Sequence, residues 1–303
     1  WDPQKDQNNL LKAFSLIPNK KKIKLFLLGE NISKQNVHLM NLIKKYDIKK
    51  DEIILHEQTD RVYDILNIFD LSVISSVGES FPNAIPESML MEIPVISTRV
   101  GDIENVINNS TGWICEPEKS YELKNKIVFA MEEFESKKTK WLQRKNNCRE
   151  KIINFFEIDE MIKNYDSIWN ETINNEKFSN IKRFKNFKYK NDKPIICHII
   201  SSMSHGGAQQ VLARIIRADK NTNHEIISLS DLGRYGNELA NEGYNLLSLN
   251  MNKFSLNIYR IFKLYGILKF KNYSLIQTWM YHADLIGGIL GYIQNKKVYW
   301  NIR

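Results

Sequence analysis

The chain has 303 residues, of which 43% are apolar and 11% are aromatic. This composition can fill the cores of two ordinary domains, and it excludes an intrinsically disordered chain. The three cysteines, Cys115, Cys148 and Cys197, lie far apart in the sequence and form no C-x-x-C pair. This spacing argues against a disulfide framework and against a structural zinc site, and it fits a reducing cytosol. No apolar run approaches the roughly 18 residues of a spanning helix, and no leader-like start is visible, so we expect neither a membrane span nor a signal peptide.

The net charge of +8 is divided unevenly along the chain. Residues 1–170 hold 24 Lys and Arg against 26 Asp and Glu, whereas residues 171–303 hold 19 against 9. A basic surface of this size is commonly turned toward phosphate-rich partners, either nucleic acid or anionic lipid, but an ordinary hydrated surface explains it equally well. Nucleic acid is the weakest of these candidates, because no aromatic residues are interleaved with the basic ones as a base-stacking motif.

Helical and strand-like segments alternate from the start of the chain, as a parallel α/β sheet requires. In the first part, strands are predicted at Ile23–Leu28, Ile53–His56, Leu71–Ser75 and Val95–Thr98. Helices are predicted at Asn8–Leu16, Gln35–Tyr46, Arg61–Phe69, Glu87–Met91 and near Glu104–Ile107. From Tyr121 to about Trp169 the pattern is helical throughout, in three charged amphipathic segments that we expect to cap one sheet.

A polar stretch rich in Asn and Lys then precedes a second α/β series. Its predicted strands are Ile195–Ile200, Glu225–Leu229, Leu246–Leu249, Leu275–Thr278 and Val298–Trp300. Its predicted helices are Ala208–Ala218, one near Glu238, Leu256–Phe270 and Ala283–Tyr292. The chain is therefore predicted to consist of a domain at 1–170, a basic linker at 171–193 and a domain at 194–303.

The most informative stretch runs from Ser75 to Ser88, between a predicted strand and the following helix, where α/β sheets bind ligands. If Asn83 is the N-cap, Pro86 falls in the first helical turn, where its missing N–H costs nothing. The free amides of that turn would face a phosphate. Glu79 and Glu87 would flank the same ligand and accept hydrogen bonds from sugar hydroxyls, although a capping or hydrated carboxylate explains either one alone.

This stretch resembles the glutamate-x7-glutamate signature of retaining glycosyltransferases of family 4, which have the GT-B fold of two Rossmann domains. Other segments look like the donor-binding half of that family in the same order: Asp2–Asp6, Leu27–Gly29, Phe69–Leu71, Ser75–Ser76, Pro94–Thr98, Val100–Asp102 and Thr111–Trp113. The resemblance covers about residues 1–170.

By this resemblance, Glu87 would hold the ribose of a nucleotide-sugar and Glu79 the transferred sugar. The backbone of Phe81, Pro82, Asn83 and Ala84 would hold the distal phosphate. Lys5 would neutralise the departing diphosphate. The family pairs this lysine with an arginine a few residues earlier, a position that would lie ahead of the first residue.

The second part resembles the other half of the same family, the acceptor-binding domain. Gly206 and Gly207 look like its glycine-rich loop and would allow a close approach of the backbone to a ligand, but a lone Gly-Gly is weak evidence and no G-x-G-x-x-G is present. His282, at a strand-to-helix turn, would face the cleft and help hold the sugar or the acceptor; a structural histidine explains it as well. His205 is weaker still.

The helix predicted at Leu256–Phe270 has a basic amphipathic pattern. This pattern is compatible with peripheral contact with an anionic membrane surface. An ordinary sheet-covering helix is the favoured interpretation.

The resemblance implies a hexosyltransferase-type, retaining enzyme with two Rossmann-like parallel-sheet domains of GT-B type. It would move a sugar from a nucleoside diphosphate donor to a glycan or lipid-linked acceptor in surface polysaccharide synthesis, in the cytoplasm or at the inner face of the membrane. The nucleotide-sugar is a co-substrate rather than a cofactor, and no metal is expected because no D-x-D motif is visible. A non-catalytic nucleotide-sugar or glycan-binding module, and a nucleotide-sugar isomerase of the same fold, remain alternatives.

The two halves occur in the reverse of the family's order, donor half first. A fragment of two fused enzymes, a circular permutation and an artificial junction would each produce this order. Both ends of the chain fall inside recognisable motifs, and the acceptor half covers about two-thirds of the family's domain. We therefore expect a fragment of a tandem enzyme, with a truncated acceptor-binding domain.

Overall fold

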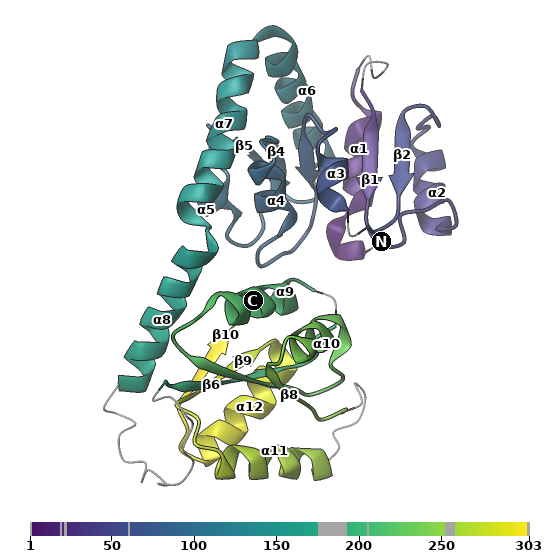
Figure 1. The fold of residues 1–303 in the computed structure, drawn as a ribbon. Helices are drawn as coiled ribbons and strands as arrows, with labels where there is room; N and C mark the ends of the chain where they lie inside the picture. The colour runs from purple at the N-terminus through teal and green to yellow at the C-terminus, as the bar shows by residue number, and fades with distance from the viewer. Residues whose placement is uncertain are drawn as a thin grey trace. The chain divides into compact units, whose positions relative to one another are not determined.

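The computed structural model describes residues 2–18, 20, 23–59, 61–174, 193–204, 206–251 and 258–301. The chain divides into two compact units, Trp1–Phe156 and Glu157–Arg303. Each is an α/β unit, and all strand pairings among the described residues are parallel. The predicted α/β fold with parallel sheets is therefore confirmed (Figure 1).

In the described part of the first unit, the strands pair in two sets. One pairs β1 (Leu25–Leu28) with β2 (Ile53–His56), and the other has the order β3 (Ser72–Ile74), β4 (Val95–Thr98), β5 (Gly112–Cys115). The 3-10 turn η1 (Pro3–Lys5) precedes the helices α1 (Gln7–Ser15), α2 (Val37–Lys45), α3 (Val62–Leu66), α4 (Ala84–Leu90), α5 (Ile103–Val106), α6 (Ser120–Ser136) and α7 (Lys138–Phe155). Strand β5 and the turn η1 were not predicted from the sequence.

A buried ion pair joins the long helices α6 and α7. Arg144 donates a hydrogen bond from Nε to Glu133 Oε1 at 2.7 Å and another from Nη1 to the Asn109 carbonyl at 2.7 Å. Its guanidinium carbon lies 4.1 Å from the ring centroid of Trp113. Burial alone would raise the pKa of Glu133, but hydrogen bonds from Arg144 and Lys140 lower it below its ordinary value. The helix pair is thus tied to the loop before β5 by charge-assisted hydrogen bonds.

Among the described residues of the second unit, five parallel strands form a sheet in the order β10-β9-β6-β7-β8. Its strands are β6 (Ile195–Ile200), β7 (Asn223–Ser228), β8 (Asn245–Ser248), β9 (Leu275–Trp279) and β10 (Val298–Asn301). Its helices are α8 (Ile158–Asn174), α9 (Gly207–Ala218), α10 (Gly233–Asn241), α11 (Ile258–Phe270) and α12 (Tyr281–Ile293). The chain leaves β6 toward β7 and later returns to β9 on the other side, so the carboxyl ends of β6 and β9 flank a topological switch point.

Helix α8 belongs to the second unit and not to the first. The Trp169 side chain is 1% exposed, and its indole N–H donates to Gln277 Oε1 on β9 at 3.1 Å. Tyr165, one turn earlier, accepts a hydrogen bond from Asn301 Nδ2 on β10 at 3.2 Å. The expectation that three helices cap the first sheet is therefore wrong for α8.

The boundaries of the two units differ accordingly from the predicted domains. The first compact unit ends at Phe156, so the predicted domain at 1–170 runs past it into α8. Residues 171–174 of the predicted linker are the last turn of α8, and residues 175–192 lie outside the described residues. The amphipathic pattern of a helix indicates that one of its faces is buried, but it does not indicate which sheet covers that face.

Candidate functional site

Lys5 and Glu79 lie together at the carboxyl end of β3. Lys5 is the last residue of η1, and Glu79 stands in the loop between β3 and α4. The Lys5 ammonium forms an ion pair with Glu79 Oε1, which also accepts a hydrogen bond from the Ser76 hydroxyl at 3.1 Å. The Lys5 side chain is 49% exposed and that of Glu79 16%, so the pair is open to solvent and to a ligand.

Hydrogen bonds from the end of β3 hold η1 in place. The Ser75 hydroxyl donates to the Lys5 carbonyl at 2.8 Å, and the Val77 N–H donates to the Gln4 carbonyl at 2.9 Å. Asp2 caps the turn by accepting from the Gln4 N–H at 2.9 Å. Two segments about 70 residues apart in sequence are thus fixed side by side, which positions the cation of Lys5 over the loop of Glu79.

The loop of Glu79 also depends on Gly101, which follows β4. Gly101 has φ +52°, and a Cβ there would lie 2.0 Å from the Ser80 carbonyl oxygen and 2.4 Å from that of Glu79. The neighbouring Asp102 N–H donates to the Ser80 carbonyl at 3.3 Å. Any side chain at 101 would displace this loop, so glycine is required both for the backbone conformation and for the close approach.

The predicted phosphate-binding segment forms the start of α4. Asn83 is at the N-cap position, as expected, but its backbone is helical (φ −56°, ψ −27°) and its side chain makes no capping hydrogen bond. Pro86 and Glu87 both fall at the start of the helix, and Glu87 is half-buried. The described geometry therefore places Glu79 in the loop and Glu87 on the helix that follows it.

Packing anchors both ends of this segment. The Phe81 ring stacks on Phe156 with centroids 6.0 Å apart and an interplanar angle of 30°, and Pro82 is buried. Ile85 and Met89, one turn apart on α4, are 1% and 0% exposed. Ala84 is exposed at the first helical position. The apolar residues of the segment are thus packed into the unit, while Asn83 and Glu87 stay partly exposed.

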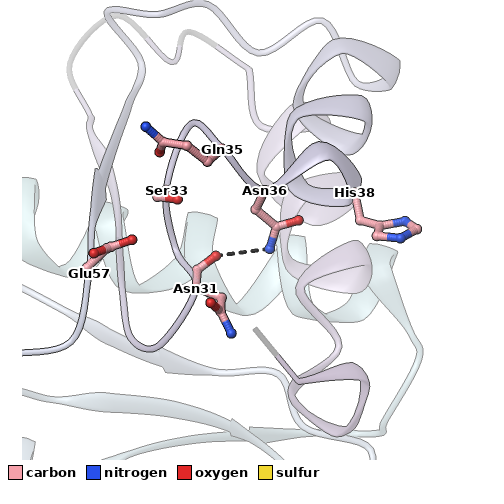
Figure 2. A pocket seen from close by; sticks show the side chains of 6 residues that line it. All are labelled: Asn31, Ser33, Gln35, Asn36, His38 and Glu57. Atoms are coloured by element: carbon pink, nitrogen blue, oxygen red, sulfur yellow. Dashed lines mark hydrogen bonds between the residues drawn. The ribbon is translucent and has the colours of Figure 1, made fainter.

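A separate hollow of about 380 Å³ lies at the loops after β1 and β2 (Figure 2). Its lining residues are Asn31, Ser33, Gln35, Asn36, His38 and Glu57. Asn36 shapes it, because its Oδ1 accepts from the Leu39 N–H at 3.0 Å at the start of α2 while its Nδ2 donates to the Asn31 carbonyl at 2.9 Å. Sequence reasoning missed these residues, although polar side chains clustered after two predicted strands were an available signal.

In the second unit, the predicted acceptor residues follow the two strands at the switch point. Gly206 and Gly207 stand at the start of α9, after β6, and His282 is the exposed second residue of α12, after β9. Ile200 pairs with Trp279 in the sheet, so the two loops begin side by side. Gly206 has φ +158°, and a Cβ there would lie 2.4 Å from Gln209 Oε1. His205 lies outside the described residues.

A chain of hydrogen bonds runs through the interior of the second unit. Trp279 Nε1–H donates to His198 Nδ1 at 3.2 Å, so a neutral His198 carries its proton on Nε2 and donates to His224 Nδ1 at 3.0 Å. His224 then donates from Nε2 to Asp219 Oδ2 at 2.9 Å. Burial holds the pKa of His198 well below its ordinary value. Burial alone would raise the pKa of Asp219, but hydrogen bonds, chiefly from His224, lower it to about 2.

Two features are absent from the part of the chain that the structure describes. No group of three or more His, Cys, Asp or Glu side chains has an arrangement that would hold a metal ion. Within those same ranges, no helix combines the length and the apolar character that a bilayer crossing needs. Burial raises the pKa of Cys115 and Cys148 to about 12, so neither thiol is a nucleophile near neutral pH.

Comparisons with known proteins each cover about half of this chain. A curated relative, N-acetyl-alpha-D-glucosaminyl L-malate synthase of Bacillus anthracis, is 25% identical over 170 residues, which are 56% of this chain and 43% of the relative. The chain thus spans less than half the length of that relative. A solved glycosyltransferase from Rickettsia africae ESF-5 is similar in fold, with a TM-score of 0.50 and 23% identity over 57% of this chain and 45% of that structure.

The family model described as "Glycosyl transferases group 1" matches residues 1–148. The matched segment takes in η1, the loop of Glu79, the whole of α4 and the hollow of Figure 2. Over these residues, which make up nearly all of the first unit, the chain is similar to glycosyl transferases group 1.

Proposed function

We propose that the first unit is the donor-binding domain of a retaining glycosyltransferase of family 4, of hexosyltransferase type. The reaction is transfer of a sugar from a nucleoside diphosphate to a hydroxyl of a glycan or lipid-linked acceptor in surface polysaccharide synthesis. The observation that carries the proposal is the solvent-accessible pair of Lys5 and Glu79, held by Ser75 and Ser76 beside the start of α4.

In the proposed mechanism, the donor diphosphate competes with Glu79 for the Lys5 ammonium. When the diphosphate binds, Lys5 turns to it and stabilises the negative charge that develops as the sugar departs. The Glu79 carboxylate, released from Lys5 but still oriented by the Ser76 hydroxyl, accepts hydrogen bonds from sugar hydroxyls. The resting ion pair holds both side chains at the site before the donor arrives, and donor binding must offset the cost of breaking that pair.

The remaining roles follow from the family resemblance. Glu87 holds the ribose, and the backbone from Phe81 through Pro82 and Asn83 to Ala84 holds the distal phosphate. The retained stereochemistry and the independence from metal ions are also taken from the resemblance and from the lack of a D-x-D motif. Addition of EDTA to an active preparation tests the second point, because loss of turnover would contradict it.

For the second unit we propose an acceptor-binding role, with Gly206 and Gly207 at the start of α9 and His282 at the start of α12. Support comes from the strand order, because both loops follow adjacent strands at the switch point of a parallel sheet. We propose that this unit begins a second enzyme of a tandem pair that works in the cytoplasm, at the inner face of the membrane.

Calorimetric titration of the whole chain with UDP, GDP and ADP, each in turn, tests the donor site. Lys5→Met should weaken nucleoside diphosphate binding at least roughly tenfold, because a charge-assisted contact to phosphate is lost. Glu79→Gln should leave that binding unchanged or strengthen it, since the competing carboxylate is removed. Lys12→Met, which changes an exposed lysine of α1, is the matched control.

The two variants are expected to differ, because Lys5→Met weakens nucleoside diphosphate binding and Glu79→Gln does not. If Glu79→Gln weakens nucleoside diphosphate binding as much as Lys5→Met does, the competition mechanism is wrong. Sugar transfer to an added acceptor, compared with donor conversion without acceptor, then separates a transferase from an isomerase and from a non-catalytic binding module. Nucleotide binding without donor conversion under either condition, in a protein that holds the donor unit together with its own acceptor-binding domain, would favour the binding module.

A further inference from the structure

The outer faces of α11 and α12 are apolar. On α11 the exposed side chains include Tyr259, Phe262 and Phe270, and on α12 they include Leu285, Ile289 and Tyr292. These six residues define the α11–α12 apolar face. Their exposed fractions run from 51% at Ile289 to 84% at Tyr292, so each projects most of a large apolar side chain into solvent.

The two helices lie next to each other on one side of the sheet. Leu264 and Leu268 of α11 and Ala283 and Leu290 of α12 belong to the same core cluster, beneath which lie alternate residues of β6. Gln294 Nε2, just after α12, donates to the Tyr265 carbonyl on α11 at 2.8 Å. Each helix therefore already buries one apolar face in the core, and the exposed residues form a second one on the opposite side.

The charges on these helices are one-sided. Exposed lysines, Lys263 and Lys269, flank the aromatic residues of α11. Along the whole of both helices, every residue of which is described, the sole carboxylate is Asp284, and it is buried. An apolar strip bordered by lysines and free of exposed acids is complementary to an anionic interface, where the ammonium groups meet phosphates and the apolar side chains enter the acyl boundary.

We propose that the α11–α12 apolar face is a peripheral docking surface for an anionic lipid bilayer. The helices lie along the membrane plane and do not cross it. Phe262, Leu285 and Ile289 enter the interface, while Lys263 and Lys269 contact lipid phosphates. This surface is formed by the second unit alone, and the proposal does not depend on the glycosyl-transfer activity proposed above.

Co-sedimentation of the whole chain with vesicles tests the proposal. Vesicles of phosphatidylcholine with about one-third phosphatidylglycerol should bind the chain at least roughly tenfold more tightly than vesicles of phosphatidylcholine alone, and the difference should shrink as salt is raised. The combined variant Phe262→Ser with Ile289→Ser should lose most of this binding. Lys263→Gln with Lys269→Gln should lose the preference for anionic vesicles while keeping the fold.

Matched controls come from the first unit. Tyr121→Ser removes an exposed aromatic residue of α6, and Lys137→Gln with Lys138→Gln removes two exposed lysines at the start of α7. Neither should change vesicle binding. Circular dichroism checks the fold of each variant, and the lysine pair remains informative should the serine variant unfold, because exposed lysines carry no core packing.

Three outcomes would overturn the proposal. One is equal binding to the two kinds of vesicle. Another is retention of anionic binding by both the serine variant and the lysine variant. The third is that the wild-type chain binds no vesicles at any salt concentration but forms a concentration-dependent dimer in sedimentation velocity, and that Phe262→Ser with Ile289→Ser abolishes this dimer. That result would assign the face to a second copy of the chain.

Discussion

Replacement of Trp169 by alanine should destabilise the second unit and leave the first unaffected. The side chain is 1% exposed and packs against Tyr165 and the imidazoles of His198 and His224, with ring centroids 5.4 to 6.1 Å apart. Truncation of a buried Trp or Phe to Ala costs about 3–5 kcal/mol. That loss is a large share of the roughly 5–15 kcal/mol that stabilises a typical domain.

A second variant separates packing from hydrogen bonding. Trp169→Phe keeps most of the apolar ring but removes the indole N–H, so Gln277 Oε1 loses its donor at a position where Gln277 Nε2 already has no partner. An unsatisfied buried group costs about 1–3 kcal/mol, so this variant should be intermediate. Asn170→Ala, at the exposed neighbouring position, should change little.

Hydrogen exchange read by mass spectrometry reports on each unit separately, which a single unfolding midpoint of a two-unit chain does not. In Trp169→Ala, amides of β6 and β9 should exchange faster, while amides of β4 and β5 keep wild-type rates. Faster exchange confined to the first unit would refute the assignment of α8. Unchanged exchange in both units would show that Trp169 contributes far less than its burial indicates.

Two further predictions concern backbone and charge. Gly101→Ala should destabilise the first unit by more than about 2 kcal/mol in urea unfolding, because residue 101 has a positive φ and its new Cβ would lie 2.0 and 2.4 Å from carbonyl oxygens. Gly266 lies within α11 with open space around its Cβ position, so Gly266→Ala should stabilise the second unit by about 0.5–1 kcal/mol. The pKa of His198 in the folded chain lies below its unfolded value of about 6.5, so at lower pH the unfolded chain binds more protons than the folded one. As the pH is lowered below about 6.5, the free energy of unfolding of the second unit should therefore decrease by up to about 1.4 kcal/mol per pH unit. A stability that stays flat from pH 7 to pH 5 would contradict this. His198→Gln should flatten the profile.

Most of the element order could be predicted from the sequence. Strand β6 is a six-residue run, apolar except for His198, that is bounded by Pro194 and a Ser-rich turn. Such a run between helical patterns predicts a buried parallel strand. The structure confirms its predicted bounds of Ile195–Ile200. Strand β5 was missed because its four residues, Gly112–Cys115, have neither alternation nor a run of β-branched residues.

The candidate donor site was only partly accessible to sequence reasoning. Glu79, Glu87 and Lys5 were each singled out, but the ion pair of Lys5 with Glu79 joins residues 74 positions apart, and no local pattern encodes such a contact. Its cause is tertiary, because Ser75 and Val77 at the end of β3 bind the backbone of η1. Asn83 occupies the N-cap position expected from the sequence, but its side chain makes no capping hydrogen bond.

The misplacement of α8 shows where local patterns stop being informative. Its stripe of Ile162, Tyr165 and Trp169 predicts burial of one face, and that prediction holds. The choice of sheet depends on partners that only the fold brings together, because Gln277 and Asn301 on β9 and β10 supply the acceptor and donor that the polar atoms of Trp169 and Tyr165 need. An apolar stripe of α8 would fit either unit, but a buried indole N–H and phenol require specific partners. The polar atoms at the rim of the stripe therefore identify the unit to which this helix belongs.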